Sequence, residues 1–474
     1  MLDGLKPYPA YKESGVPWLG KVPEHWEVRR LKALFREVDR RSSAGTERLL
    51  SLRQASGLVD HEQVGGKPIT PDHLVGFKIV QPGEIVMNRM RASAGLFAAA
   101  STTGLVSPDY AVFCQTGPLR TDYFVRLFRT PLMGATFRRE SRGLGTGESG
   151  FLRLYSDSFG QLAAPYPPEV EQLRIVRFLD HADREVRRYV RVRQRLVMLL
   201  EQQKGMICDR AVVRGIVSDI SLKPSGLPWL GNVPEQWDVL SLRRRWEVVD
   251  CKHLTAPFVP EGVPLASVRE AQTFDLDLAK ANRTTQEYYE KLIGGGRAPR
   301  KGDVIYCRNV SVGASAFVGT DEPFAMGQDV CLIRSSTENC RFLNYVLHSP
   351  AMKRQLQNVL VGSTFDRINV AEVKNLTIAV PPRREQDEIV EHLDRTFAEI
   401  DAAIRSARRE LVLVREFRER LVSDVITGRL DVRAAATALP EPDTGPDVLD
   451  DFGSAEDEVE GDADGVPVPD EADA

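Results

Sequence analysis

Arginines at matched places in two stretches of the sequence are the side chains with the most evident chemistry. Arg89 ends a β-branched run that follows a Pro-Gly turn, and Arg153 lies in a Phe-Leu-Arg-Leu segment further along. Arg308 and Arg367 occupy the same two places in the second stretch. A planar guanidinium group can bond guanine O6 and N7 together or clamp a phosphate, so these positions are candidate DNA contacts. A structural ion pair is an equally good interpretation of each matched pair.

Further candidates lie near these four arginines. Two glycine-rich segments, residues 143–150 and 293–303, would let a loop approach a duplex closely, because glycine has no side chain in the way. Since most surface arginines are only solvated or ion-paired, each position is a separate hypothesis. The predicted DNA-contacting residues are Arg89, Arg91, Arg138, Arg139, Arg142 and Arg153 in the first stretch and Arg308, Asn309 and Arg367 in the second.

Residue patterns that carry catalysis are absent from the sequence. Residues 143–150 do not end in Gly-Lys-Ser/Thr and form no P-loop, and neither His-Glu-x-x-His nor Gly-x-Ser-x-Gly occurs. The seven histidines do not cluster, and the six cysteines show neither Cys-x-x-Cys pairs nor zinc-site spacing. We therefore predict no catalytic residue, no metal site and no cofactor. Reduced, unpaired thiols and a cytoplasmic location are expected.

The elements that must position these arginines come in two copies. Residues 12–28 read KESGVPWLGKVPEHWEV and residues 223–239 read KPSGLPWLGNVPEQWDV, which together contain four of the five tryptophans. Proline and glycine exclude a regular helix here, so each copy is predicted to be an irregular arm. A structural clasp formed by the packed indoles is favoured over a peptide-binding surface. Each arm is followed by about 130 to 140 residues of strand-like pieces that share little outside a few anchors.

After each of these stretches comes a long helix with apolar residues three and four positions apart. In the second copy the series runs from Val390 to Val425 and is interrupted by Arg418. The first copy, 214 residues earlier, is interrupted by Asp183, Arg193 and Lys204. This 3.5-residue period predicts that the two helices pair with each other along roughly 54 Å, at 1.5 Å per residue. Val-Arg-Gly215 and Ile-Thr-Gly428 end them, where glycine can take the left-handed C-cap conformation.

Charge is divided unevenly along the chain. From residue 441 onward there are fourteen Asp and Glu and no Lys or Arg, so a formal net charge of −4 becomes +10 without this segment. A basic, arginine-rich body is compatible with a polyanion such as DNA, while the acidic tail is predicted to be disordered. No apolar run approaches the length needed to cross a membrane, and we expect no membrane association.

Taken together and in duplicate, these motifs resemble the specificity (S) subunits of type I restriction-modification systems, the HsdS family. The resemblance covers about residues 12–432 and rests on the two arms, the strand-Arg elements, and the proline boxes at 167–180 and 381–394 that lead into the helices. The first proline box reads PYPPEVEQ and the first helix ends VVRGI, which are small departures. The acidic tail has no counterpart that we can assign.

The resemblance implies an α+β fold with an internal pseudo-two-fold repeat. Two α/β target-recognition domains would be separated by two long helices that form an antiparallel coiled coil. The expected divisions are an arm and first recognition domain (1–166), a first spacer helix (167–216), a second arm and recognition domain (217–380), a second spacer helix (381–431) and an acidic disordered tail (432–474).

It also implies a non-catalytic function in DNA recognition. Each recognition domain would read one half of a bipartite site in double-stranded DNA, and divergence of the two domains predicts that the site is asymmetric. The helices would set the spacer and dock methyltransferase (M) subunits, two of them, which bring S-adenosylmethionine; restriction (R) subunits would join that complex. The alternatives are a coiled-coil scaffold that binds protein partners and the specificity subunit of a modification-only complex.

Overall fold

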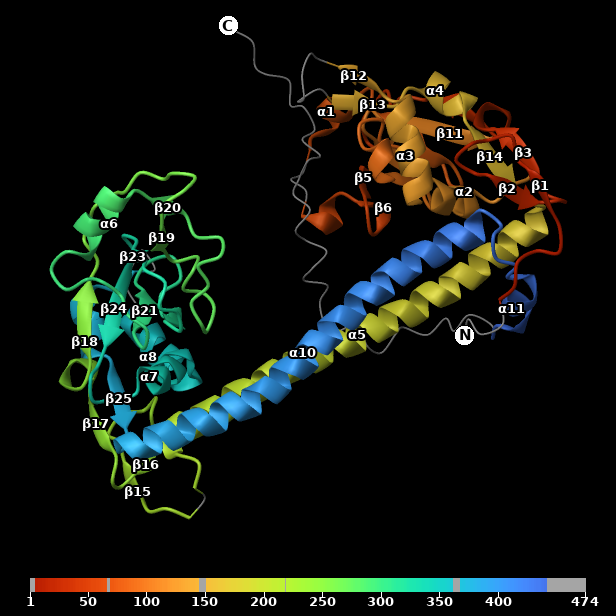
Figure 1. The fold of residues 1–474 in the computed structure, drawn as a ribbon. Coiled ribbons are helices and arrows are strands. Elements are labelled where there is room, and N and C mark those ends of the chain that lie inside the picture. Colours follow the sequence, from red (N-terminus) through yellow and green to blue (C-terminus); the bar gives the residue numbers. More distant parts are fainter. Residues whose placement is uncertain (1–4, 66–68, 145–150, 218, 361–366, 441–474) are drawn as a thin grey trace, which may run out of the picture. The chain divides into compact units, whose positions relative to one another are not determined.

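The computed structural model divides the chain into two compact units, and the divisions fall within the two long helices. Unit 1 comprises residues 1–191 with 411–474, and unit 2 comprises residues 192–410. The structure describes residues 5–65, 69–144, 151–217, 219–360 and 367–440. The long helices are α5 (Glu169–Arg214) and α10 (Arg383–Ile426) (Figure 1), and each contributes one part to each unit.

Unit 1 is built on a four-stranded antiparallel sheet in the order β4-β11-β8-β9. The bounds of its sheet strands are β4 Phe35–Val38, β8 Ile85–Met87, β9 Phe97–Ala99 and β11 Ala111–Gln115. Phenylalanines from the sheet and its covering helices, Phe97, Phe128 and Phe159 among them, pack ring against ring in its core. The helices are α1 Pro71–Leu74, α2 Thr121–Phe128, α3 Pro131–Glu140, α4 Ser156–Gln161 and α11 Arg433–Ala438.

Unit 2 repeats this plan with a sheet in the order β18-β24-β21-β22. Its strands are β18 Glu247–Asp250, β21 Val304–Cys307, β22 Ser315–Phe317 and β24 Val330–Arg334. Strand order and antiparallel pairing are the same as in unit 1. The helices are α6 Gln286–Ile293, α7 Cys340–His348, α8 Pro350–Leu360 and α9 Val370–Asn375. The matched anchors in the sequence therefore correspond to matched strands of two equivalent sheets.

Two further elements are common to the two units. Each unit has a two-stranded arm and a second two-stranded pair that closes the domain where the long helix starts. In unit 1 these are β1 Tyr11–Glu13, β2 Lys21–Pro23, β3 Glu27–Arg30 and β14 Ala163–Tyr166. In unit 2 they are β15 Leu222–Pro224, β16 Asn232–Pro234, β17 Asp238–Ser241 and β25 Thr377–Val380.

The remaining strands differ between the units. Unit 1 adds the pairs β5-β6, β7-β10 and β12-β13, with bounds β5 Leu50–Arg53, β6 Gly57–Asp60, β7 Lys78–Val80, β10 Gly104–Val106, β12 Arg142–Leu144 and β13 Phe151–Arg153. Unit 2 adds one three-stranded sheet from β19 Val263–Ala266, β20 Arg283–Thr284 and β23 Ala325–Met326. The two units thus share a frame and differ in the segments that it carries.

The long helices pair with each other within each unit, as the 3.5-residue period predicts, and their orientation is antiparallel, as the family resemblance implied. The charged residues that interrupt the apolar seam are paired across it. In unit 1, Arg418 Nε lies 2.8 Å from Asp183 Oδ1. In unit 2, Lys204 Nζ lies 2.6 Å from Asp401, and an Arg193 nitrogen lies 3.0 Å from Glu410. These ion pairs favour one register of the helices over its neighbours, because a shift would leave each charge against an apolar side chain.

Glycine ends both helices as predicted. Gly215 has φ +78° and Gly428 has φ +79°, the left-handed conformation that other residues adopt at a cost. The described part of the chain contains no helix that is both long and apolar enough to span a bilayer. Of the predicted acidic tail, residues 433–438 form α11, while residues 441–474 lie outside the described residues.

Candidate nucleic-acid interface

The sheet domain of each unit is fixed to its long helix through the Glu-Gln pair of the proline box. In unit 1, buried Gln172 accepts a hydrogen bond from the backbone N–H of Arg120, just before α2, and donates to Pro167 O. In unit 2, Gln386 makes the same two contacts, with the N–H of Asn339 before α7 and with Pro381 O. Both glutamines therefore satisfy a helix N-terminus that no backbone carbonyl reaches.

The neighbouring glutamates hold the arms. Trp26 Nε1 donates to Glu171 Oε1 at 3.1 Å, and Trp237 Nε1 donates to Glu385 Oε2 at 3.0 Å. Glu171 also accepts from Tyr8 Oη and contacts His25 Nε2, at 2.5 and 2.7 Å. Burial, together with the bond to Glu171, raises the pKa of Tyr8 far above its ordinary value. The structure thus supports the predicted clasp for the arms.

Each arm also covers the last turn of the other repeat's helix. A side chain at Gly428, after α10, would lie 2.5 Å from Pro23 and 2.9 Å from the Trp26 ring. At Gly215, after α5, it would lie 3.4 Å from Trp237 and 3.1 Å from Glu385. Each arm therefore clamps the start of one long helix and the end of the other, which is a consequence of antiparallel pairing.

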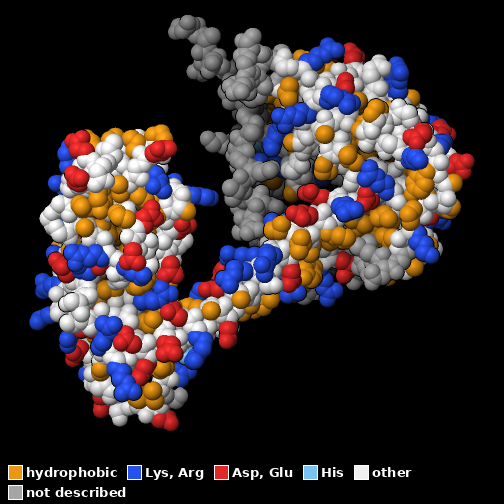
Figure 2. Space-filling view, in the orientation of Figure 1, with side chains coloured by type: hydrophobic (Ala, Val, Ile, Leu, Met, Phe, Trp, Pro, Cys, Tyr) orange, Lys and Arg blue, Asp and Glu red, His pale blue; other side chains and the backbone are white. Residues whose placement is uncertain are grey.

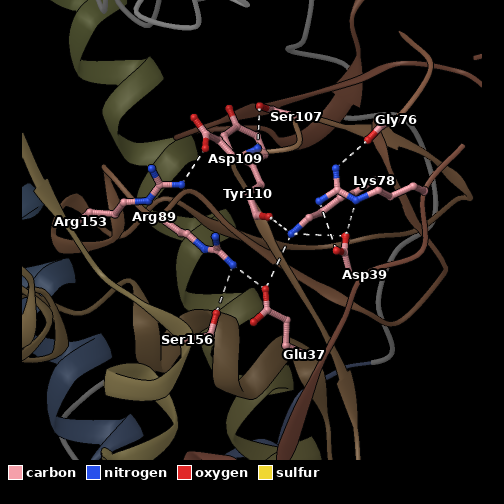
Figure 3. Close-up of polar contacts among 11 residues, drawn as sticks. Glu37, Asp39, Gly76, Lys78, Arg89, Ser107, Asp109, Tyr110, Arg153 and Ser156 are labelled. Atoms are coloured by element: carbon pink, nitrogen blue, oxygen red, sulfur yellow. Dashed lines mark hydrogen bonds and ion pairs between the residues drawn. The ribbon is translucent and has the colours of Figure 1, made fainter.

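The two matched arginines of unit 1 lie close together: Arg89 follows β8 and Arg153 ends β13 (Figure 3). The backbone N–H of Leu154 donates to Arg89 O, and in unit 2 the N–H of Ile368 donates to Arg308 O. The structure therefore brings Arg89 and Arg153 onto adjoining backbone segments in unit 1, and their matched counterparts Arg308 and Arg367 onto adjoining segments in unit 2. Their side chains do not share one environment.

In unit 1 both matched arginines form ion pairs inside the domain. Arg89 Nη2 lies 2.5 Å from Glu37 Oε1 and 3.3 Å from Ser156 Oγ, and Arg153 Nη2 lies 2.6 Å from Asp109 Oδ1 (Figure 3). Their side chains are only 18% and 19% exposed. Lys78, also buried, donates to Tyr110 O, and burial followed by the nearby Arg89 charge lowers its pKa. These groups form a packed polar layer at the edge of the sheet.

In unit 2, Arg308 is buried and its guanidinium is already occupied. Nη2 lies 3.0 Å from Asp250 Oδ1 and 3.5 Å from Cys251 Sγ. Asp250, Cys251 and His253 bring three potential metal-ligand atoms within 4.8 Å of one another. A cation there would lie against the Arg308 charge, and burial raises the pKa of the Cys251 thiol, so these residues do not suit a metal ion. Partly buried Asn309 donates to Asp329.

The other predicted residues are more accessible. Arg138 and Arg139 end α3 and Arg142 begins β12; all three are exposed, as is Arg367. Arg139 pairs with the adjacent Glu140, whereas Arg138, Arg142 and Arg367 have no ion pair with another described residue. The last predicted residue, Arg91, is half-buried. Exposed guanidinium groups without a protein partner are the ones that can reach phosphates or base edges without first breaking an ion pair.

Exposed apolar residues, which were not among the predicted contacts, lie close to two of the matched arginines. Val310 is 75% exposed and has φ +63°, a conformation that costs a β-branched residue free energy and often marks functional loops. Met90, just after Arg89, is exposed in unit 1. The sequence signal was an apolar residue one or two positions after the strand-Arg element, Met90 after Arg89 and Val310 after Arg308-Asn309.

Comparisons with known proteins agree with this architecture. Residues 267–407 match the family described as the type I restriction modification DNA specificity domain. Two equivalent sheets on paired helices, with divergent loops and exposed arginines, are consistent with this class of protein.

Similar chains extend this match over most of the sequence. The MjaVIII specificity subunit of Methanocaldococcus jannaschii is 22% identical over 87% of this chain and 95% of its own length. The EcoBI specificity subunit of Escherichia coli is 28% identical over 36% of this chain and 34% of its own.

Solved structures show the same fold. A chain from a study of complex assembly and conformational transition of a type I restriction-modification system has a TM-score of 0.66 at 17% identity, over 85% of this chain and 98% of its own. The HsdS subunit of Thermoanaerobacter tengcongensis has a TM-score of 0.51 at 16% identity, over 88% of this chain and 99% of its own. Residues 267–407 thus carry a type I restriction-modification specificity domain, and over most of its length the chain is similar to specificity (HsdS) subunits, the family that its repeated motifs resemble.

Proposed function

We propose that this chain is the DNA sequence-recognition subunit of a type I restriction-modification complex, and that each sheet-based domain reads one half of a bipartite, asymmetric site. The observation that carries the proposal is the contrast between frame and insertions. Strand order, arms and helix anchors are the same in the two units, whereas the strands added to each sheet are different. A common frame with divergent additions suits two readers that dock alike and recognise different bases.

Exposed arginines are proposed to make the DNA contacts, with Arg138, Arg139 and Arg142 in unit 1 and Arg367 in unit 2. Figure 2 shows several Lys and Arg side chains on the face of unit 1 that is in view. Arg89, Arg153 and Arg308 are proposed to position the neighbouring loops through their ion pairs, as the alternative interpretation of the matched arginines states. Their guanidinium groups would contact DNA only if those pairs opened.

The paired helices are proposed to set the spacer and to dock two methyltransferase subunits. Large apolar side chains are exposed along them, and Figure 2 shows hydrophobic side chains at the surface of the helices. In unit 1 these include Val412, Leu413 and Phe417, and in unit 2 they include Leu199 and Met206. Exposed apolar groups in such number favour a protein partner. Methyl transfer and DNA translocation would belong to the M and R subunits, and this chain would be non-catalytic.

A duplication within the chain tests the proposal. Leu31 and Leu242 close the two domains in the same way, since their N–H groups donate to Leu162 O and Leu376 O at 2.7 and 2.8 Å. Replacing residues 242–376 by residues 31–162 would mount two copies of the first domain on the native frame. The reciprocal replacement is the matched control.

The readout is adenine methylation in cells that supply the cognate methyltransferase subunits. The first duplication is expected to direct methylation to a symmetric site made of two inverted copies of one half-site, and the reciprocal chain to two copies of the other. The spacer should stay unchanged. If both duplicated chains fold and still direct methylation to the original asymmetric site, the assignment of one half-site to each domain is wrong. A changed protein partner with an unchanged DNA motif would favour the scaffold function.

A further inference from the structure

One face of α5 carries basic residues at regular intervals. The series repeats at spacings of three and four residues, always two positions before a seam position, and so lies outside the contact with α10. We call it the basic strip, and it consists of Arg174, Arg177, His181, Arg184, Arg188 and Arg191. Arg174, Arg184 and Arg188 are exposed and have no ion pair with another described residue.

The charge of the basic strip is not balanced within the helix. Between residues 174 and 191 the acidic residues are Asp180, Asp183 and Glu185. Asp180 and Asp183 are both paired with Arg126, and Asp183 with Arg418 as well. Within the helix only Glu185 is left to offset the exposed members Arg174, Arg184 and Arg188, which present positive charge to solvent.

The basic strip is not part of the repeated frame. The positions 214 residues later on α10 are Glu388, Glu391, Arg395, Ala398, Ala402 and Arg405. Two acidic and two apolar residues there give the second helix no comparable charge. Because only one of the two matched helices carries the strip, we look for its partner among segments that also occur only once in the chain.

The acidic C-terminal segment is present once, and it starts at the basic strip. Arg177 donates hydrogen bonds to Leu439 O and Pro440 O, at 2.8 and 3.1 Å. The preceding helix α11 is anchored by Val432 and Ala436, which are buried in the core of unit 1. These contacts fix residue 440 against the second residue of the strip.

Charge and length of residues 441–474 match the strip. The segment has fourteen Asp and Glu and no Lys or Arg in 34 residues. A random-coil chain of 34 residues has a root-mean-square end-to-end distance of about 30 Å. The strip from Arg177 to Arg191 covers 14 residues of helix, or about 21 Å at 1.5 Å per residue.

We propose that residues 441–474 dock on the basic strip of α5 as an internal polyanion. Duplex DNA is a polyanion too, so the docked segment also shields this part of the body from non-specific DNA contacts and is displaced by DNA at sufficient concentration. This second consequence rests on the proposed function, whereas docking itself does not.

Proteolysis of the full-length chain with an endoprotease that cuts after glutamate tests docking directly. Release of C-terminal fragments from the acidic segment is followed by mass spectrometry at 50 and 300 mM salt. We expect slow release at low salt and release about fivefold faster at high salt, since cleavage follows the fraction of undocked segment and salt screens the attraction.

Two charge variants of equal size separate docking from a net-charge effect. The strip variant Arg174→Gln/Arg184→Gln/Arg188→Gln should release the fragments fast at both salt concentrations. The control variant Arg395→Gln/Arg405→Gln/Arg409→Gln removes three exposed arginines of α10 and should behave as the wild type. Unchanged release from the strip variant, or equal acceleration in both variants, would overturn the proposal. Circular dichroism checks that both variants stay folded.

The consequence for DNA is measured in the same assay by adding a non-specific duplex at 50 mM salt. Faster release from the wild type, without further acceleration of the strip variant, is the expected result. If the duplex binds but leaves release from the wild type unchanged, the competition is refuted while docking stands on the first measurement. If no duplex binds at all, the proposed function fails and the docking result is unaffected.

Discussion

The clasp at Glu171 gives the sharpest prediction, because its counterpart in the second repeat holds fewer partners. Glu171 is buried and accepts hydrogen bonds from Tyr8 and Trp26, both of which are buried. Partly exposed Glu385 accepts one, from Trp237. Removing an acceptor from a buried donor costs about 1–3 kcal/mol. Glu171→Ala should therefore lower the free energy of unfolding of unit 1 by about 2–6 kcal/mol, and Glu385→Ala that of unit 2 by about 1–3 kcal/mol.

Hydrogen exchange at increasing urea concentration, read by mass spectrometry on peptides from each unit, resolves the two effects. Exposed Glu388→Ala is the control and should change neither unit by more than about 0.5 kcal/mol. Glu171→Ala should accelerate exchange in β3 and β14 and leave β17 and β25 unchanged. Equal losses from the two substitutions, or a loss at Glu171 no larger than the control, would show that the hydrogen bonds in the structure do not hold the arm.

Three further predictions concern the helices and the arginines. Burial would raise the pKa of Asp183, but Arg126 and Arg418 outweigh burial, so the pKa lies below its ordinary value. The stability that this carboxylate contributes should therefore be present above pH about 4 and be lost below it. In urea denaturation, the Asp183→Asn variant should not show this loss of stability at low pH. One heptad inserted into both helices near the Arg193–Glu410 pair adds about 10 Å, which corresponds to roughly three base pairs, so the spacer of the methylated motif should lengthen by that amount. Methylation should be less efficient, because three base pairs rotate the half-site far more than a heptad rotates the domain. An unchanged spacer would refute the proposal that the helices set its length. Arg138→Gln with Arg142→Gln should weaken DNA binding and lower its salt slope by about 2, whereas an equal slope in fluorescence anisotropy would exclude both residues from phosphate contact.

The frame could be predicted from the sequence because it depends on local periodicity and on repetition. A 3.5-residue apolar period and a glycine after each helix are sufficient to predict paired helices and their ends. One ion pair across the seam was also accessible, because Asp183 and Arg418 both interrupt the series and antiparallel pairing brings them together. The matched tryptophans of the two repeats predicted that the arms act as clasps, whereas their hydrogen bonds to Glu171 and Glu385 became visible only in the structure.

The environment of the arginines could not be predicted from the sequence. Glu37 pairs with Arg89 across 52 residues of chain and Asp109 with Arg153 across 44, so these contacts depend on how the sheet is assembled. Nothing in the spacing distinguishes such an arginine from exposed Arg138. Burial, which decides whether a guanidinium is available to DNA, follows from the tertiary packing of segments with no common pattern.

The most direct test of the central claim is to map adenine methylation across the genome of the organism with this gene intact and with it deleted. We predict that deletion removes one split, asymmetric motif while other methylation persists, which would identify both half-sites at once. If every methylated motif survives the deletion of an expressed gene, the chain does not direct DNA modification, and the recognition function proposed for its two domains is contradicted.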